Sequence, residues 1–74
     1  MIVHFINPQK IGQYKYYDVL LVEDDNTLYR LNMGFIFSES ENVMEEQVNN
    51  ILQNLDPTKI ITQVIIDTPV SWQF

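Results

Sequence analysis

Residues 14–37 read YKYYDVLLVEDDNTLYRLNMGFIF, and this stretch decides the fold. From Tyr29 onward every second residue is large and apolar, which places these side chains on one face of a β-strand. The apolar set is Tyr29, Leu31, Met33, Phe35 and Phe37. The run 16–22 is instead apolar on both faces, a pattern typical of a central strand or of a strand covered on both sides.

Between these two runs lie four polar residues, EDDN at 23–26. Asp and Asn favour turns because their side chains bond to nearby backbone and because they tolerate left-handed conformations. We therefore predict a β-hairpin with its tip near residues 24–26. Gly34, inside the second strand, indicates either a β-bulge or the close approach of another group to the backbone.

A helix is predicted to follow the hairpin. Ser38 with Glu41, and Asn42 with Glu45, have the spacing of a capping box, and Ser40 is a third candidate cap. Apolar residues then recur at intervals of three and four and so form one helical face: Val43, Met44, Val48, Ile51, Leu52 and Leu55. The helix should end at residues 55–56, because the residue before Pro57 disfavours helical geometry.

Two further strands are predicted at the ends of the chain. Residues 1–6 form a short apolar run that should stop before Pro8, which cannot donate a ladder hydrogen bond, so 7–13 is a connection. Residues 59–67 are rich in β-branched side chains on both faces, which favours a central position or cover on both sides. The sequence thus predicts one α+β domain over 1–74. Its antiparallel-rich sheet of about four strands carries one amphipathic helix on one face, in the order β-β-β-α-β.

This arrangement leaves a surplus of apolar surface. Two strands are apolar on both faces, yet one helix covers only one face of a sheet. A second cover is therefore expected, which would be a partner, a second copy of the chain, or the C-terminal tail with Trp72 and Phe74. We predict that the tail packs on its own domain, with docking into a partner as the alternative.

Composition limits the function. The 74 residues carry ten acidic and four basic side chains, for a net charge of −6, and no cysteine. Direct binding of nucleic acid needs a basic footprint and is not expected. No apolar run is long enough to span a membrane, and no basic region followed by an apolar run marks a secretory signal, so we expect a cytoplasmic protein. The charge itself favours basic partners, although it also simply keeps a small domain soluble.

Nothing in the chain predicts an enzyme, a metal or a cofactor. His4 is the only histidine and has no cysteine or second histidine with which to share a metal. Gly12 and Gly34 are the only glycines, too few for a phosphate-binding loop. Residues 23–26 lack the alternating spacing of calcium ligands.

Binding is the remaining class of function. One acidic cluster lies at the hairpin tip and a second at the start of the helix: Glu23, Asp24 and Asp25, and Glu39, Glu41, Glu45 and Glu46. If both point the same way, they form a negative surface suited to a basic groove; otherwise they are two separate solvated features. Tyr14 and Tyr16 are candidate interface residues, since tyrosine combines apolar area with a polar tip.

Residues 17–25, YDVLLVEDD, and residues 38–42, SESEN, resemble the acidic segments of small phage-encoded inhibitors. These include uracil-DNA glycosylase inhibitors and DNA-mimic anti-CRISPR proteins. The resemblance implies a non-enzymatic inhibitor that engages a basic nucleic-acid-binding protein, in the host cytoplasm if the chain is phage-encoded. Ten acids against four bases is a moderate charge for a DNA mimic.

Two functional hypotheses follow. In the first, an acidic face binds a basic protein, and Glu23, Asp24, Asp25, Glu41 and Glu45 are the first residues to test. In the second, the chain is a structural or assembly module. It would form a homodimer through an apolar sheet face or through Trp72 and Phe74.

Overall fold

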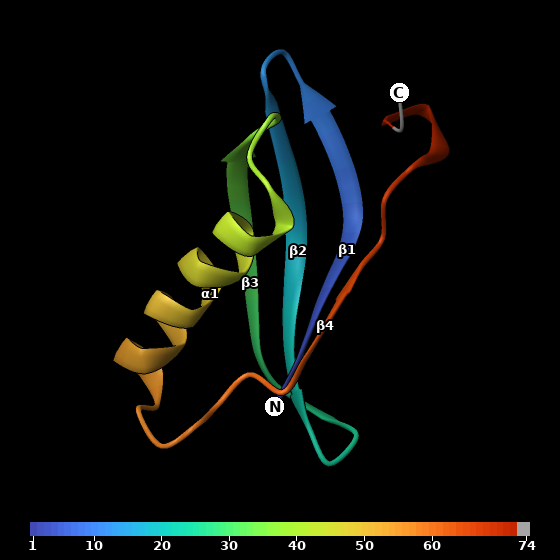
Figure 1. Ribbon diagram of the computed structural model, residues 1–74. Helices are drawn as coiled ribbons and strands as arrows, with labels where there is room; N and C mark the ends of the chain where they lie inside the picture. Colours follow the sequence, from blue (N-terminus) through green and yellow to red (C-terminus); the bar gives the residue numbers. More distant parts are fainter. Residues whose placement is uncertain (73–74) are drawn as a thin grey trace.

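The computed structural model describes residues 1–72 and confirms the predicted α+β class and order of elements (Figure 1). The elements are β1 (Ile2–Ile11), β2 (Tyr14–Glu23), β3 (Asn26–Ile36), α1 (Glu41–Leu55), β4 (Gln63–Ile66) and the short 3₁₀ helix η1 (Val70–Trp72). The strands form one sheet in the order β3-β2-β1-β4. The first three strands are antiparallel, and β4 runs parallel to β1.

The predicted hairpin is confirmed. Strands β2 and β3 are joined by Asp24 and Asp25, whose φ angles are 52° and 62°. Positive φ at both central residues is the signature of a type I′ turn, which matches the twist of the strands on either side. The two-sided apolar pattern of β2 also fits its central position between β3 and β1.

Strand β1 passes through Pro8, so the prediction that it stops before this residue is wrong. Asn7 has a φ of 53°, and the pairing of β1 with β2 shifts between Ile6 and Gln9. This β-bulge places Pro8 where no ladder hydrogen bond is needed. The predicted connection over 7–13 shrinks accordingly to the two-residue turn Gly12–Gln13, in which Gly12 has a φ of 59°.

Gly34 is not the site of a bulge. The shift in the β2–β3 pairing lies between Leu21 and Val22 instead. The alternative interpretation, close approach, is confirmed, because the ring of Tyr16 lies directly over Gly34. A Cβ at position 34 would fall 2.7 Å from Cε1 of Tyr16.

Helix α1 begins at Glu41, and its N-cap is Ser40, the third of the three candidates. The Oγ atom of Ser40 accepts a hydrogen bond from the backbone N–H of Val43 at 3.3 Å. The predicted capping boxes that start at Ser38 and Asn42 therefore do not cap helix α1. The helix ends at Leu55 with Asp56 as C-cap, as predicted.

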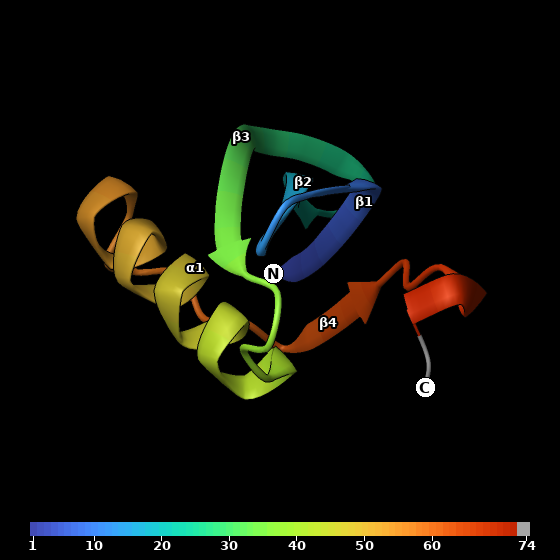
Figure 2. The same ribbon diagram turned by 90° about the horizontal axis from the view of Figure 1, so that it is seen from above.

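The core lies between α1 and one face of the sheet. Its buried members come from β1, β2, β3 and α1: Val3, Phe5, Tyr17, Val19, Leu21, Phe35, Met44, Val48 and Leu52. The rings of Phe5 and Tyr17 meet edge to face, with centroids 5.5 Å apart. Seen from above, the sheet is strongly twisted and the helix lies on one side of it (Figure 2).

Strand β4 is short and lies at an edge, which corrects the prediction of a central strand over 59–67. Only Gln63–Ile66 pair with the sheet. Before them, the chain is tied to Met1, whose ammonium group donates to the carbonyl of Ile60 at 2.9 Å. The apolar residues on both faces therefore do not reflect a central position, and Ile60 is left 73% exposed.

The C-terminal segment packs on its own domain, as predicted for Trp72; Phe74 lies outside the described residues. The Trp72 ring centroid is 5.2 Å from that of Phe37 and 6.2 Å from that of Tyr17. Tyr17 belongs to the face of the sheet that α1 covers. The tail thus adds to this covered face, and no other element of residues 1–72 covers the opposite face.

The helix offers a direct test of this core. Leu52 is fully buried and Leu55 is 46% exposed, although both lie in the last turn of α1. We expect Leu52→Ala to lower the free energy of unfolding by about 2–5 kcal/mol, because it leaves a cavity. Leu55→Ala, the matched control, should cost less than about 1 kcal/mol. Urea unfolding followed by circular dichroism measures both, and equal losses would contradict this packing.

Candidate functional site

A groove lies between α1 and the segment that leads into β4. Its volume is about 520 Å³. It is lined by Asn42, Glu45, Glu46, Asn49, Ile60 and Ile61. We call this surface the acidic groove.

Helical spacing accounts for one wall of the acidic groove. Asn42, Glu45, Glu46 and Asn49 are three or four positions apart, so their side chains lie on one side of α1. The other wall is Ile60 and Ile61, in the segment that runs from the helix to β4. This segment is fixed at two points: Gln53 Nε2 donates to the carbonyl of Lys59 at 3.1 Å, and Met1 holds Ile60.

The groove combines negative charge with apolar surface. Within residues 1–72, the carboxylates of Glu45 and Glu46 form no ion pair or hydrogen bond. Ile60 is exposed, and Ile61 packs against the core. Lys and Arg side chains have the matching form, because they carry a cationic head on an apolar stem. The groove thus has the chemistry to hold a basic side chain.

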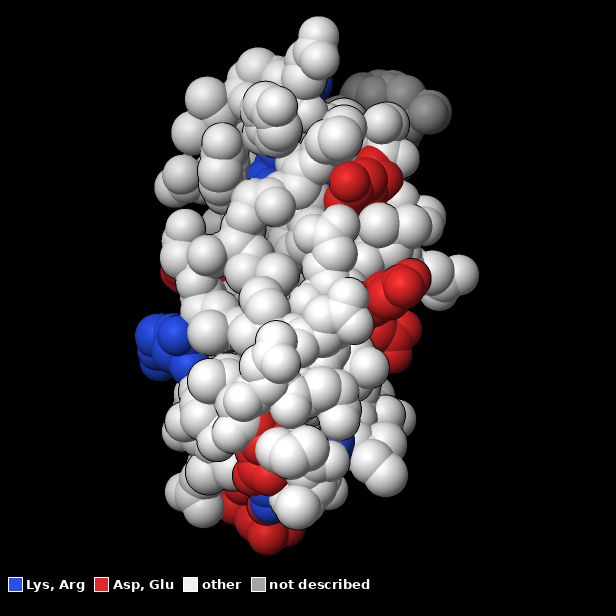
Figure 3. Space-filling view, turned by 90° about the vertical axis from the view of Figure 1, so that its left-hand side faces the viewer, with Lys and Arg blue, Asp and Glu red and all other residues white. Residues whose placement is uncertain are grey.

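The structure separates the two acidic clusters. Lys15 Nζ donates to the carbonyl of Glu39 at 2.8 Å, which fixes the start of α1 at one end of β2, whereas Glu23 lies at the other end. Eight residues of strand put these ends about 26 Å apart. On the face drawn in Figure 3, acidic residues form separate patches with uncharged surface between them.

The cluster at the hairpin tip is also partly neutralised. Lys59 Nζ donates to Glu23 Oε1 at 2.6 Å, and both side chains are partly buried. This hydrogen bond is the main reason that the pKa of Lys59 is raised. Asp24 and Asp25 remain exposed on the turn. Of the two predicted acidic clusters, Glu45 and Glu46 line the acidic groove, and Glu41 lies one turn before Glu45 on the same helix.

The predicted aromatic candidates divide between the two faces of the sheet. Tyr14 and Tyr16 have ring centroids 6.5 Å apart and lie opposite the helix side, with Tyr14 51% exposed. Trp72 lies on the helix side, beside Phe37. The nine predicted binding residues therefore do not form one site, and Phe74 is outside the described range.

A smaller cavity of about 130 Å³ lies beside the start of α1. Its polar lining includes Lys15, Tyr17, Glu41 and Thr68. Burial lowers the pKa of Lys15, while Glu39 and Glu41 act in the opposite direction. Burial, with the nearby charges of Glu41 and Asp67, raises the pKa of Tyr17. The Lys15 ammonium is held by the carbonyl of Glu39, so this lysine anchors the helix start to the sheet.

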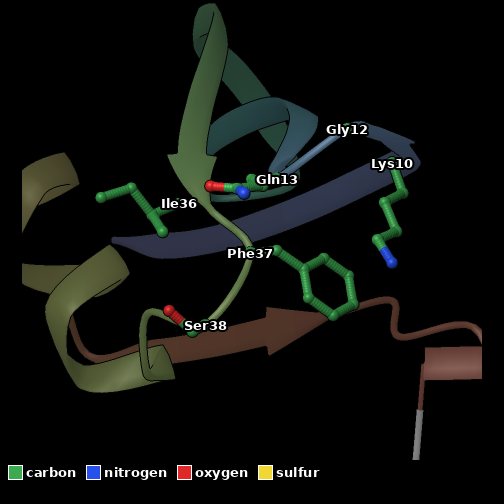
Figure 4. Close-up of a pocket in the computed structure, with 6 residues that line it drawn as sticks. All are labelled: Lys10, Gly12, Gln13, Ile36, Phe37 and Ser38. Carbon is green, nitrogen blue, oxygen red and sulfur yellow. The ribbon is translucent and has the colours of Figure 1, made fainter.

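A third hollow, of about 300 Å³, lies at the end of the sheet where β3 meets the Gly12–Gln13 turn (Figure 4). The Phe37 ring points to the side of Lys10, and Ile36 points away from it. Lys10 Nζ is 4.3 Å from the centroid of the Phe37 ring, a cation–π contact. Ser38 lines this hollow, but no histidine or carboxylate does, so nothing there would activate its hydroxyl.

Sequence reasoning missed Ile60, Ile61 and Asn49 as members of a site. Their position depends on how the segment after α1 folds back along the helix, and no local pattern encodes that path. In the part of the chain that the structure describes, no three His, Asp or Glu side chains come close enough to hold a metal ion. Neither described helix, 41–55 or 70–72, is long and apolar enough to cross a membrane.

Comparisons of the chain with protein-family models, curated proteins and solved structures find no match in any of the three.

On the uncovered face of the sheet, Asp18 is held by two amides. Asn7 Nδ2 donates to one carboxylate oxygen at 2.9 Å, and Asn32 Nδ2 donates to the other at 3.1 Å. These hydrogen bonds lower the pKa of Asp18 below its ordinary value of 3.8. They also join the bulge of β1 at Asn7 to β2 and β3.

Asp18 should therefore stabilise the fold only while it is ionised. Because its folded pKa lies below its unfolded pKa, this stability is present above pH 3.8 and is lost as the pH falls through the folded pKa. We expect the Asp18→Asn variant to lose less stability than the wild type as the pH falls from about 5 to about 2. Urea midpoints across this range measure the effect. Asp25→Asn, on the exposed turn, is the control, and an identical pH profile for wild type and Asp18→Asn would contradict the assignment.

Proposed function

We propose that this chain is a non-enzymatic binding protein that takes a basic segment of a protein partner into the acidic groove. The observation that carries the proposal is the lining of the groove, which has a volume of about 520 Å³. Glu45 and Glu46 on one wall form no ion pair within residues 1–72, and Ile60 and Ile61 form the other wall. That volume is within the range of roughly 300–1,000 Å³ usual for ligand sites.

Recognition would combine two interactions. The carboxylates of Glu45 and Glu46 would accept hydrogen bonds from a guanidinium or ammonium group, and charge-assisted bonds of this kind are the stronger ones. Ile60 and Ile61 would pack against the aliphatic stem of the same side chain. Asn42 and Asn49 add amide donors and acceptors for the backbone of a bound peptide. The net charge of −6 would speed the encounter with a basic partner.

The partner class that fits is a protein whose surface binds phosphate. Such surfaces present Lys and Arg side chains, and a carboxylate offers them oxygen acceptors as a phosphate does. This agrees with the resemblance to acidic inhibitors of nucleic-acid enzymes. Inhibition would then follow from occupation of the basic surface, with α1 as the contacting element. The hairpin tip, about 26 Å from the start of α1, would be secondary.

A defined peptide tests the groove. We expect acetyl-Arg-Ile-Arg-amide to shift the backbone amide NMR signals of residues 42–49 and 60–61. The Glu45→Lys/Glu46→Lys double variant should weaken this binding at least tenfold, because it replaces both acceptors with cations. Raising the salt concentration from about 0.05 to 0.5 M should also weaken it, since the groove is open to solvent.

The matched control is Asp24→Lys/Asp25→Lys. Each double variant changes the net charge from −6 to −2, because every substitution adds two units, so only position differs. Binding by the tip variant should stay within about threefold of wild type. Equal losses in both variants would mean that net charge alone attracts the peptide, and no shift at 42–49 in wild type would contradict the groove.

A further inference from the structure

The face of the sheet opposite α1 carries apolar side chains towards both of its ends, with the hydrogen-bonded group of Asn7, Asp18 and Asn32 between them. Strict alternation places on it the residues between the buried ones of each strand: Ile2, Ile6, Leu20, Val22 and Ile65. At one end, Ile11, Tyr14 and Ile36 pair across β1, β2 and β3 and form one row. They are 60%, 51% and 49% exposed. We call this surface the open face.

Apart from Asp18 on the central strand β2, the open face carries one cation and one anion at its two opposite edges. Arg30 is on β3, one edge strand, in the same cross-strand row as Leu20 and His4. Asp67 directly follows β4, the other edge strand, and its carboxylate is 3.6 Å from His4 Nε2. Within residues 1–72, the Arg30 guanidinium forms no ion pair or hydrogen bond, although its charge contributes to the lowered pKa of Asp18. Asp18, between the edges, is already held by Asn7 and Asn32.

We propose that the open face binds a second copy of this chain, and that Arg30 of each copy pairs with Asp67 of the other. A two-fold axis that lies between two such faces and runs along the strands puts β3 of one copy over β4 of its partner. Arg30 of each copy then lies opposite Asp67 of the other copy, so the dimer contains this contact twice. On the central strands β1 and β2, Ile6, Leu20 and Val22 of the two copies would face each other and be buried.

The size of the face is sufficient for a weak dimer. Three strands about 33 Å long at about 4.8 Å spacing, with the short β4 beside them, give roughly 500 Å² in projection. Stable complexes bury about 800 Å² per partner, and weaker ones less. We therefore expect a dissociation constant between about 1 and 100 µM.

Net charge separates this contact from binding in the acidic groove. Two copies each carry −6, so their overall electrostatic interaction is repulsive and the apolar face must drive association. Salt screens the repulsion and should strengthen the dimer, whereas it should weaken peptide binding in the groove. The two surfaces also lie on opposite sides of the sheet, so an experiment that contradicts one binding proposal leaves the other proposal untouched.

Charge reversal tests the pairing. Arg30→Asp leaves two acidic edges, and Asp67→Arg leaves two basic edges, so each variant alone should sediment as a monomer at 100 µM. An equimolar mixture should form a heterodimer, because both cross-contacts then join opposite charges. The variants carry net charges of −8 and −4, so attraction between the whole molecules cannot explain that result. Analytical ultracentrifugation with one variant fluorescently labelled measures all three samples.

Three outcomes would overturn the proposal: a wild-type chain that stays monomeric up to 1 mM, single variants that dimerise as well as wild type, or a mixture that stays monomeric. Leu20→Glu, in the middle of the open face, should also abolish the dimer. Val43→Glu, an exposed apolar site on α1, is its control and should leave the dimer intact. Circular dichroism confirms folding of each variant. Arg30→Asp should leave peptide binding in the groove unchanged.

Discussion

A single fifteen-residue helix can cover one face of a four-stranded sheet, and this constraint shapes the rest of the molecule. On the covered face, Met44, Val48 and Leu52 of α1 close over Phe5, Tyr17 and Val19, and Trp72 extends the same layer. On the other face, no element of the described residues 1–72 provides cover. That face keeps Ile6, Leu20 and Val22 beside the polar group around Asp18, and this much apolar surface is unusual for the solvent side of a sheet.

The two sides of the sheet thus differ in the interactions they offer. The helix side carries the amides and carboxylates of α1, and in the acidic groove its apolar surface comes from Ile60 and Ile61. The open face carries more apolar surface, with Asp18 on its central strand and one opposite charge at each edge. Attraction of basic groups on the first side depends on charge and is screened by salt; association on the second depends on removing apolar surface from water. A dimer through the open face would leave both acidic grooves outward and able to bind at once.

Much of the fold could be predicted from local sequence. The tip of the β2–β3 hairpin follows from Asp24 and Asp25, which accept positive φ, and the bounds of α1 follow from its apolar period and from Pro57. The course of β1 through Pro8 was missed, because the bulge at Asn7 is stabilised by Asp18, eleven positions away. The edge position of β4 and the isoleucine wall of the groove depend on contacts with Met1 and Gln53, which no local pattern specifies. For the same reason the candidate site was predicted only in part, through Glu45 and Glu46.

The pairing of β1 with β4 affects how the chain folds while it is being synthesised. Hydrogen bonds between Thr62 and Met1 join residues 61 positions apart, and β4 completes the edge of β1. The β1–β2–β3 meander can assemble as soon as it leaves the ribosome, because its contacts are local. Until α1 and β4 follow, however, Val3 and Phe5 have no cover and the outer edge of β1 is open to other nascent chains. The second half of the sequence, which holds α1 and β4, therefore covers the apolar side chains and the open edge of β1, and a truncated translation product would be prone to aggregate.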